Sequence, residues 1–134
     1  MWRRLVVLAA ALAAATGIAA CGSDDNPNNP RPPSPIELTA RISDRDIAVS
    51  PSELGGGPVS ITVSNQSRQP ASLTLEGPTD AVGAELPPGA VGELKATLEE
   101  GQYEISGGPE SSAREGTLEV GPDRQSSQNE LLLP

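Results

Sequence analysis

The chain contains no histidine and no phenylalanine, and it has one cysteine, one methionine, one tryptophan and one tyrosine among 134 residues. Without histidine, a Ser-His-Asp triad and an imidazole general base are excluded. The shortage of aromatic side chains, a net charge of −9 and the lack of a basic patch argue against a nucleic-acid partner. Because Trp2 lies at the start, a core further along must be built from aliphatic residues with Tyr103 as its one aromatic side chain.

Other catalytic patterns are missing as well. Lys95 is the only lysine, and no serine stands three residues before it, so a Ser-x-x-Lys nucleophile is absent. The glycine triplet at 55–57 is not followed by Lys-Ser or Lys-Thr, so it is not a phosphate-binding loop. Glu99 and Glu100 are adjacent at a turn, where their side chains point apart and are solvated. We therefore do not expect an enzyme, and we expect no cofactor.

The first 21 residues have the layout of an export signal. Arg3 and Arg4 provide a positive start, and residues 5–15 form an uninterrupted apolar run. The sequence Ile18-Ala19-Ala20-Cys21 then closes the segment. It matches a lipobox, so the segment resembles the signal of bacterial lipoproteins. That resemblance implies cleavage after Ala20, acylation of Cys21, and anchoring in lipid at the extracytoplasmic face of the bacterial cell membrane.

Two other interpretations of this segment are weaker. A transmembrane helix needs roughly 20 apolar residues, and the run is shorter. An ordinary secretory signal would leave Cys21 as a lone thiol without a disulfide partner in an exported protein. Lipidation accounts for that thiol.

The rest of the chain divides by composition. Residues 21–35 comprise the lipidation site and a stretch rich in Pro, Asn and Asp that cannot bury a core, so we expect a disordered tether after a signal helix at 1–20. Residues 36–121 show the patterns of a folded domain. Residues 122–134 are mostly polar, and we expect a disordered tail.

Apolar and polar residues alternate in short runs across the domain, which predicts β-strands. Turns rich in Gly and Pro separate the runs, and no amphipathic helix is evident. The expected strands lie at 36–42, 47–49, 59–63, 71–75, 94–98, 102–106 and 117–120. About seven short strands of this kind indicate an all-β protein, a Greek-key β-sandwich. The spacing from Leu98 through Gly101 to Tyr103 also predicts a tyrosine corner, in which the phenol bonds back to the main chain.

Three passages of the domain resemble cupredoxins. Val59 to Asn65 followed by Gln69-Pro70-Ala71 is similar to their strand-Asn-x-x-x-x-Pro-His passage. The run from Leu86-Pro87-Pro88-Gly89 to Gly101-Gln102-Tyr103 is similar to their proline-glycine, strand and glycine-x-tyrosine run. Residues 116–120 resemble their closing strand. The resemblance covers residues 36–121 and implies a cupredoxin-like scaffold.

The copper ligands of that family do not carry over. A blue-copper centre needs two imidazoles and a thiolate, usually with a weak axial methionine. On the resemblance, the first histidine would fall at Ala71 and the cysteine near Ser106 or Gly107. The second histidine and the methionine would fall within 109–114. None of these ligands is present, so we expect a metal-free domain.

The resemblance directs attention to the loops where a copper site would lie. We expect a binding or structural module whose partner, an unidentified envelope protein, contacts Gln69, Pro70, Ala71, Ser106, Gly107, Gly108, Pro109 and Glu110. The neighbouring stretches 87–89 and 111–114 belong to the same end. Simple mobility of the Gly-rich loop is the alternative interpretation of 106–114.

A second function remains open, namely an accessory protein of an iron or copper uptake or redox system that uses a site without histidine. Asp44 and Asp46 flank Arg45 and could offer oxygens to a cation. The stretch lacks the further ligands and the glycine of a calcium loop, so ordinary turn chemistry is the favoured explanation.

Overall fold

The computed structural model describes residues 31–126, so the expected signal, Cys21 and most of the expected tether and tail lie outside the described residues. Within this range the chain forms eight strands and no helix. No helix there is long and apolar enough to cross a membrane. The strands are β1 (Ile36–Ile42), β2 (Ile47–Ser50), β3 (Glu53–Asn65), β4 (Thr74–Glu76), β5 (Ala81–Val82), β6 (Val91–Leu98), β7 (Gly101–Ser106) and β8 (Gly116–Asp123).

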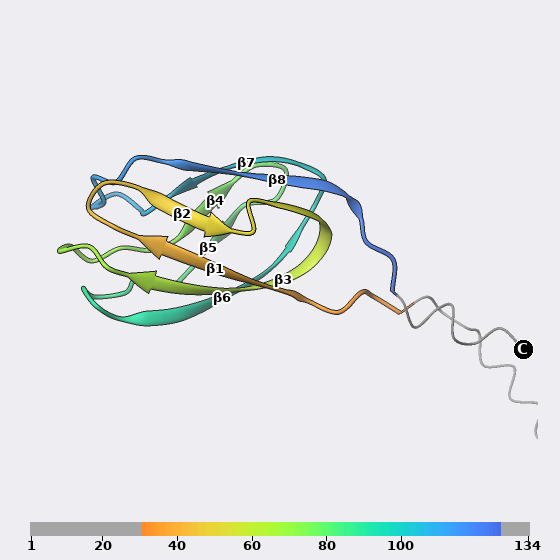
Figure 1. The fold of residues 1–134 in the computed structure, drawn as a ribbon, viewed down its shortest axis with the longest axis horizontal. Coiled ribbons are helices and arrows are strands. Elements are labelled where there is room, and N and C mark those ends of the chain that lie inside the picture. Colours follow the sequence, from red (N-terminus) through yellow and green to blue (C-terminus); the bar gives the residue numbers. More distant parts are fainter. Residues whose placement is uncertain (1–30, 127–134) are drawn as a thin grey trace, which may run out of the picture.

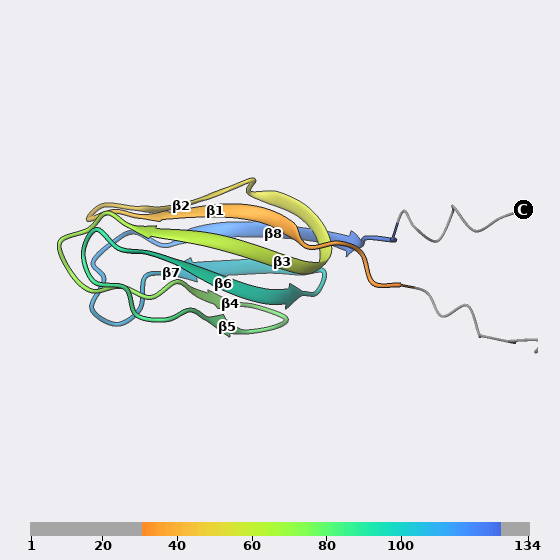
Figure 2. The ribbon, with the colours of Figure 1, turned by 90° about the horizontal axis from the view of Figure 1, so that it is seen from below.

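The strands are arranged in two packed layers (Figures 1 and 2). We call the layer with the strand order β2-β1-β3-β6 sheet A. The other layer, which runs from β8 through β7 and β4 to β5, is called sheet C. The long strand β3 belongs to both layers. Its first residues, 53–56, pair in parallel with β8, whereas residues 57–64 pair antiparallel with β6. The prediction of an all-β Greek-key sandwich is confirmed, and the cupredoxin-like architecture stays a prediction.

The core lies between the sheets, and strand alternation accounts for it. In β1 the residues Leu38, Ala40 and Ile42 are buried, while the residues between them are exposed. Val59, Ile61 and Val63 of β3 are buried as well, and Ser60 between the first two is also buried. Aliphatic side chains thus fill most of the interior, as the composition requires.

The tyrosine corner is also confirmed. Tyr103 on β7 is completely buried, and its hydroxyl donates to the main-chain oxygen of Glu99 over 3.1 Å. The same hydroxyl accepts a hydrogen bond from the Glu99 nitrogen over 3.0 Å. The ring packs closely on Gly77, where an added Cβ would lie 2.7 Å from a ring carbon. The phenol therefore fixes the turn between the two sheets.

The two ends of the described chain leave the sandwich at the same pole (Figure 1). We call this end, with residues 31–35, 77–80, 99–100 and 124–126, the terminal pole. Arg124 holds it together by donating to the main-chain oxygens of Ser34 (2.9 Å), Pro58 (2.6 Å) and Gly56 (3.1 Å). The opposite end, with residues 43–46, 66–72, 83–90 and 107–115, is the loop pole.

Three details of the fold differ from expectation. Residues 53–56, which lie between the expected strands at 47–49 and 59–63, form the start of β3, because sheet C supplies β8 as a distant partner. Between the expected strands at 71–75 and 94–98 lies β5, a two-residue strand paired with β4. β8 extends to Asp123, two positions past the expected domain end, and Arg124 is bonded to the domain. The described part thus has eight strands in place of about seven.

Candidate functional site

The three stretches singled out from the sequence meet at the loop pole. Ala71 exchanges two main-chain hydrogen bonds with Leu86, over 3.0 and 2.8 Å. The nitrogen of Ser72 donates to the Gly107 oxygen over 3.0 Å, which joins the first stretch to the third. The predicted convergence of 69–71, 87–89 and 106–114 on one end of the sandwich therefore holds for the main chain.

Asn65, at the end of β3, ties these stretches together. Its side chain is completely buried. The Nδ2 atom donates to the main-chain oxygens of Gln69 (2.9 Å) and Leu86 (2.8 Å). The Oδ1 atom accepts from the nitrogen and the hydroxyl of Ser67, over 3.0 and 2.7 Å. Every donor of the amide is therefore paired, and its oxygen accepts two bonds.

The main chain of Asn65 continues this network. Its nitrogen donates to the Ala90 oxygen over 2.9 Å, and its oxygen accepts from the Gly89 nitrogen over 2.7 Å. A further bond of 3.1 Å joins the Ala90 nitrogen to the Pro87 oxygen. The Pro-Pro-Gly turn is thus fixed to the end of β3, and this part of the loop pole is a bonded framework.

The positions where copper ligands would stand cannot hold that metal. Ala71 is 3% exposed and carries only a methyl group. Gly107 is buried, and an added Cβ would lie 2.5 Å from the Ser111 hydroxyl oxygen. Gly108 has a φ of 84°, and an added Cβ would lie 2.6 Å from the hydroxyl oxygen of Ser72. None of these three positions carries a side chain with a nitrogen or sulfur ligand. At 107 and 108 the space for a larger side chain is occupied by Ser111 and Ser72. The site does not fit copper.

The remaining candidate residues differ in their exposure. Gln69, Pro109 and Glu110 are exposed, whereas Pro70 and Ser106 are half-buried. A hydrogen bond of 3.1 Å from the Ser111 nitrogen to the Gly108 oxygen closes the turn that contains 109 and 110. Of the expected contact residues, Gln69, Pro109 and Glu110 are the ones most available to a partner.

Two aspartates of the loop pole, Asp44 and Asp46, each lie beside an arginine. Asp44 accepts from the nitrogen and from Nε of Arg68, both over 2.9 Å, and these bonds lower the pKa of the Asp44 carboxyl. Asp46 accepts from the Ser43 hydroxyl over 2.6 Å and lies 3.5 Å from Arg41. Asp46 therefore serves in its own turn, and Asp44 joins that turn to the loop that contains Arg68. Within residues 31–126 no group of three Asp, Glu, His or Cys residues is arranged to hold a metal ion.

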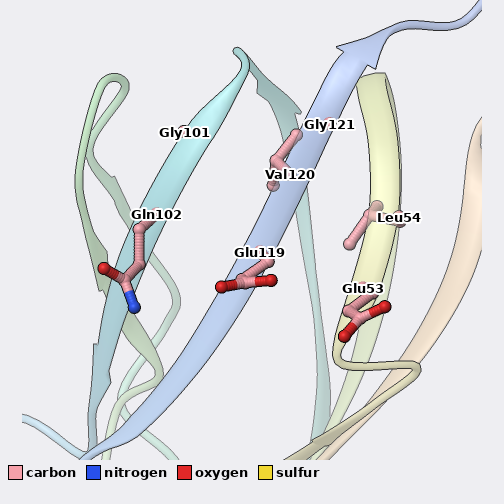
Figure 3. A pocket seen from close by; sticks show the side chains of 7 residues that line it. All are labelled: Glu53, Leu54, Gly101, Gln102, Glu119, Val120 and Gly121. Atoms are coloured by element: carbon pink, nitrogen blue, oxygen red, sulfur yellow. The ribbon is translucent and has the colours of Figure 1, made fainter.

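The outer face of sheet C is acidic, a feature that sequence reasoning missed. Glu53, Gln102 and Glu119 come from three different strands and line a hollow of about 510 Å³ (Figure 3). Strand alternation alone indicates that Gln102 and Glu119 face outward. The parallel pairing of β3 with β8, which brings Glu53 beside Glu119, has no local sequence signal.

A second acidic contact lies on the same face. The carboxyl groups of Glu104 and Glu115 interact, and this interaction raises the pKa of Glu104. The charge repulsion between the two groups acts in the same direction. Two carboxylates at an exposed strand end offer too few ligands for a metal and have no nucleophile to assist.

Comparisons with known proteins assign no family. No protein-family profile matches the sequence, and no curated protein matches it. Among solved structures, the chain is similar to one described as a heme-copper terminal oxidase dimer, determined by cryo-EM. The two chains are 14% identical, the similarity covers 89% of each, and the TM-score is 0.40. A likeness at this level supports no inference about function.

Proposed function

We propose that this chain is a lipid-anchored module of the bacterial envelope that binds another protein through the loop pole. In this proposal acylated Cys21 holds the chain at the extracytoplasmic face of the membrane. The observation that carries it is the position of the two described ends at the pole opposite the candidate loops (Figure 1). A tether that enters at the terminal pole directs the loop pole away from the bilayer.

The length of the tether supports this arrangement. In an extended, polyproline-like conformation, residues 22–30, which precede the terminal pole, would reach roughly 28 Å at about 3.1 Å per residue. That distance exceeds the thickness of a lipid headgroup layer. The loop pole can therefore reach a neighbouring protein above the membrane surface.

The bonded framework of the loop pole suits a binding role. The hydrogen bonds of Asn65 hold the stretches around Gln69 and Leu86 in place before any partner arrives. A surface that is already ordered loses less conformational entropy when it binds. The exposed residues Pro87, Pro88 and Pro109 add rigid, weakly hydrated contact area.

Anchoring is tested by replacing the cysteine. Cys21→Ser removes the sulfur that would carry diacylglycerol, so we expect the variant to leave the membrane fraction and to lose incorporation of a labelled fatty acid. Cys21→Ala serves as a second variant with the same expectation. Retention of either variant in lipid at the parent level would refute lipid anchoring through this residue.

The contact surface is tested by crosslinking in intact cells. A photo-crosslinking amino acid in place of Gln69 or Glu110 probes the loop pole, and the same amino acid in place of Glu100 probes the terminal pole. We expect one recurrent neighbour from the first two positions and not from the third. Recovery of the same neighbour from Glu100 alone would place the contact elsewhere and overturn this part of the proposal.

The alternative function, an accessory to iron or copper handling through a site without histidine, makes a different prediction. It requires a metal bound in a fixed ratio to the chain. Metal analysis after purification from native membranes measures that ratio directly. A stoichiometric metal would favour the alternative over a metal-free binding module.

A further inference from the structure

β6 is the longest free edge of the sandwich. It has eight residues, and within residues 31–126 it pairs with β3 and with no other strand. The edge strands β2 and β5 have four and two residues. The end of β2 is also protected, because Ile47 donates to the Arg114 oxygen over 3.2 Å. A long edge with unpaired main-chain groups is a template for another strand.

The charges of the two outer faces differ. On the strands of sheet A, the outward side chains Glu37 and Glu93 are balanced by Arg41 and Lys95. Outward residues on the strands of sheet C include Glu76, Glu104 and Glu119, with no basic residue among them. Two copies of this acidic chain therefore repel each other least when they meet along sheet A.

The outward residues of β6 are complementary to themselves. Consider two β6 strands, one from each copy, paired antiparallel with Leu94 on the two-fold axis. Glu93 of each copy then lies opposite Lys95 of the other copy. Directly opposed residues of opposite charge stabilise such a pair. Because of the symmetry, this contact occurs twice.

Neighbouring registers lack this match. A slip of one residue places outward side chains opposite inward ones and breaks the continuity of the face. A slip of two residues brings either Glu93 opposite Glu93 or Lys95 opposite Lys95 of the second copy. The charge pattern of β6 therefore selects one register.

The segment behind β6 does not occupy its edge. Residues 83–86 are bonded to residues 71–73, where the Gly83 nitrogen donates to the Leu73 oxygen over 2.8 Å. Leu86 packs behind the strand, since an added Cβ on Gly92 would lie 2.8 Å from its Cδ2. This segment closes the core on the inner side of the strand. The outward side chains Val91 (63% exposed) and Lys95 (73% exposed) remain accessible.

We propose that a second copy of this chain is the partner of β6, and that two chains form a symmetric dimer by antiparallel β6–β6 pairing centred on Leu94. The two four-stranded sheets then form one continuous sheet. The loop poles stay free, so the dimer presents two of them.

Charge reversal tests the pairing. Glu93→Lys and Lys95→Glu each turn both attractive contacts into repulsive ones. We expect either change to raise the dissociation constant of the dimer roughly tenfold. The double variant Glu93→Lys/Lys95→Glu restores opposite charges and should regain the parent dimer. Glu119→Lys, on the far face of sheet C, makes the same change in charge and should not weaken the dimer. Sedimentation equilibrium of the full chain in density-matched detergent measures all four variants.

Disulfide trapping tests the register. Val91 and Thr97 of the second copy lie opposite each other in this arrangement, so Val91→Cys/Thr97→Cys should crosslink two chains on mild oxidation. A variant with only one of the two cysteines should give no more crosslinked dimer than the parent chain, because identical positions of the two copies lie far apart along the paired strands. Thermal unfolding of each variant checks that the domain is folded. A parent chain that stays monomeric at all concentrations, a double charge variant that fails to recover, or efficient crosslinking by a single cysteine would overturn the proposal.

Discussion

Replacing Asn65 by alanine is expected to loosen the loop pole and to destabilise the whole domain. The change removes the four side-chain hydrogen bonds of a completely buried amide. The Leu86 oxygen keeps the Ala71 nitrogen as a donor, and the single proton of the Ser67 hydroxyl, which lies within reach of both Asn65 Oδ1 and the Gln69 oxygen, is then left to donate to Gln69. The Ser67 nitrogen has no other acceptor recorded among the described residues.

The magnitude follows from these contacts. At about 1 kcal/mol net for each intramolecular hydrogen bond, with partial relaxation of the two carbonyl groups, the loss comes to about 3 kcal/mol. For a domain of this size, about 1 kcal/mol corresponds to roughly 4–8 °C in the unfolding midpoint. We therefore expect Asn65→Ala to lower the midpoint by roughly 12 °C or more, as followed by circular dichroism.

A nearly isosteric variant separates hydrogen bonding from volume. Asn65→Asp keeps an acceptor for Ser67 but places a carboxylate oxygen against the main-chain oxygens of Gln69 and Leu86. The pKa of that carboxyl is therefore expected to rise on folding, so the native state binds more protons and stability falls as the pH rises above the ordinary aspartate range. The variant should be weakest at neutral pH and recover in part near pH 4.

Two outcomes would refute this reasoning. One is an Asn65→Ala midpoint within a few degrees of the parent, which would mean that water replaces the amide without cost. The other is an Asn65→Asp variant whose deficit is the same at low and neutral pH. Gln66→Ala, at the exposed neighbouring position, serves as the control and should change stability by less than about 0.5 kcal/mol.

Two further predictions concern sheet C. Tyr103→Phe keeps the buried ring but removes the hydroxyl bonded to Glu99, so we expect a loss of about 1 kcal/mol in chemical denaturation, and an unchanged midpoint would show that the corner bonds contribute nothing. The raised pKa of Glu104 means that its folded form holds a proton above the ordinary value of 4.5, so its contribution to stability falls as the pH rises past that value. Denaturation curves taken at several pH values give the pH dependence of the free energy of unfolding. Glu104→Gln should make that dependence flatter, whereas Glu119→Gln should not. The same pH dependence in the parent and in Glu104→Gln would contradict the interaction with Glu115.

Much of the fold could be predicted because strand alternation is a local property. In β1 and in the second half of β3, every second residue is apolar and buried, and the expected strands fall where the structure has them. Tyr103 was identifiable for the same reason, since the tyrosine corner depends on spacing within one turn. Features of this kind need no knowledge of distant partners.

The start of β3 could not be predicted, because it depends on residues far along the chain. A glycine triplet indicates a loop when it is considered alone. Here it crosses from one sheet to the other, with the break in register between Gly55 and Gly56. An added Cβ at Gly55 would lie 2.6 Å from a side-chain carbon of Arg124, 69 positions further on. Glycine is required there by Arg124, which the local sequence does not reveal.

The candidate site shows the same division. Its loops were placed at one end by the resemblance to cupredoxins, and the absence of copper ligands follows from composition alone. The role of Asn65 could not be derived, because its amide bonds to main-chain atoms of two other stretches. The acidic face of sheet C was missed because its members come from β3, β7 and β8.

Hydrogen bonds account for the convergence of the loops at the loop pole. Metal ligands in a protein draw separate segments together, and the binding energy becomes folding energy. Here the Asn65 amide and the main-chain bonds of Ala71 and Ser72 make those connections. A histidine at 71 alone would find no second ligand, and a cysteine at 107 would collide with Ser111. The pole is thus complete as a hydrogen-bonded structure, and its free chemistry lies in the exposed residues Gln69, Pro109 and Glu110 rather than in its interior.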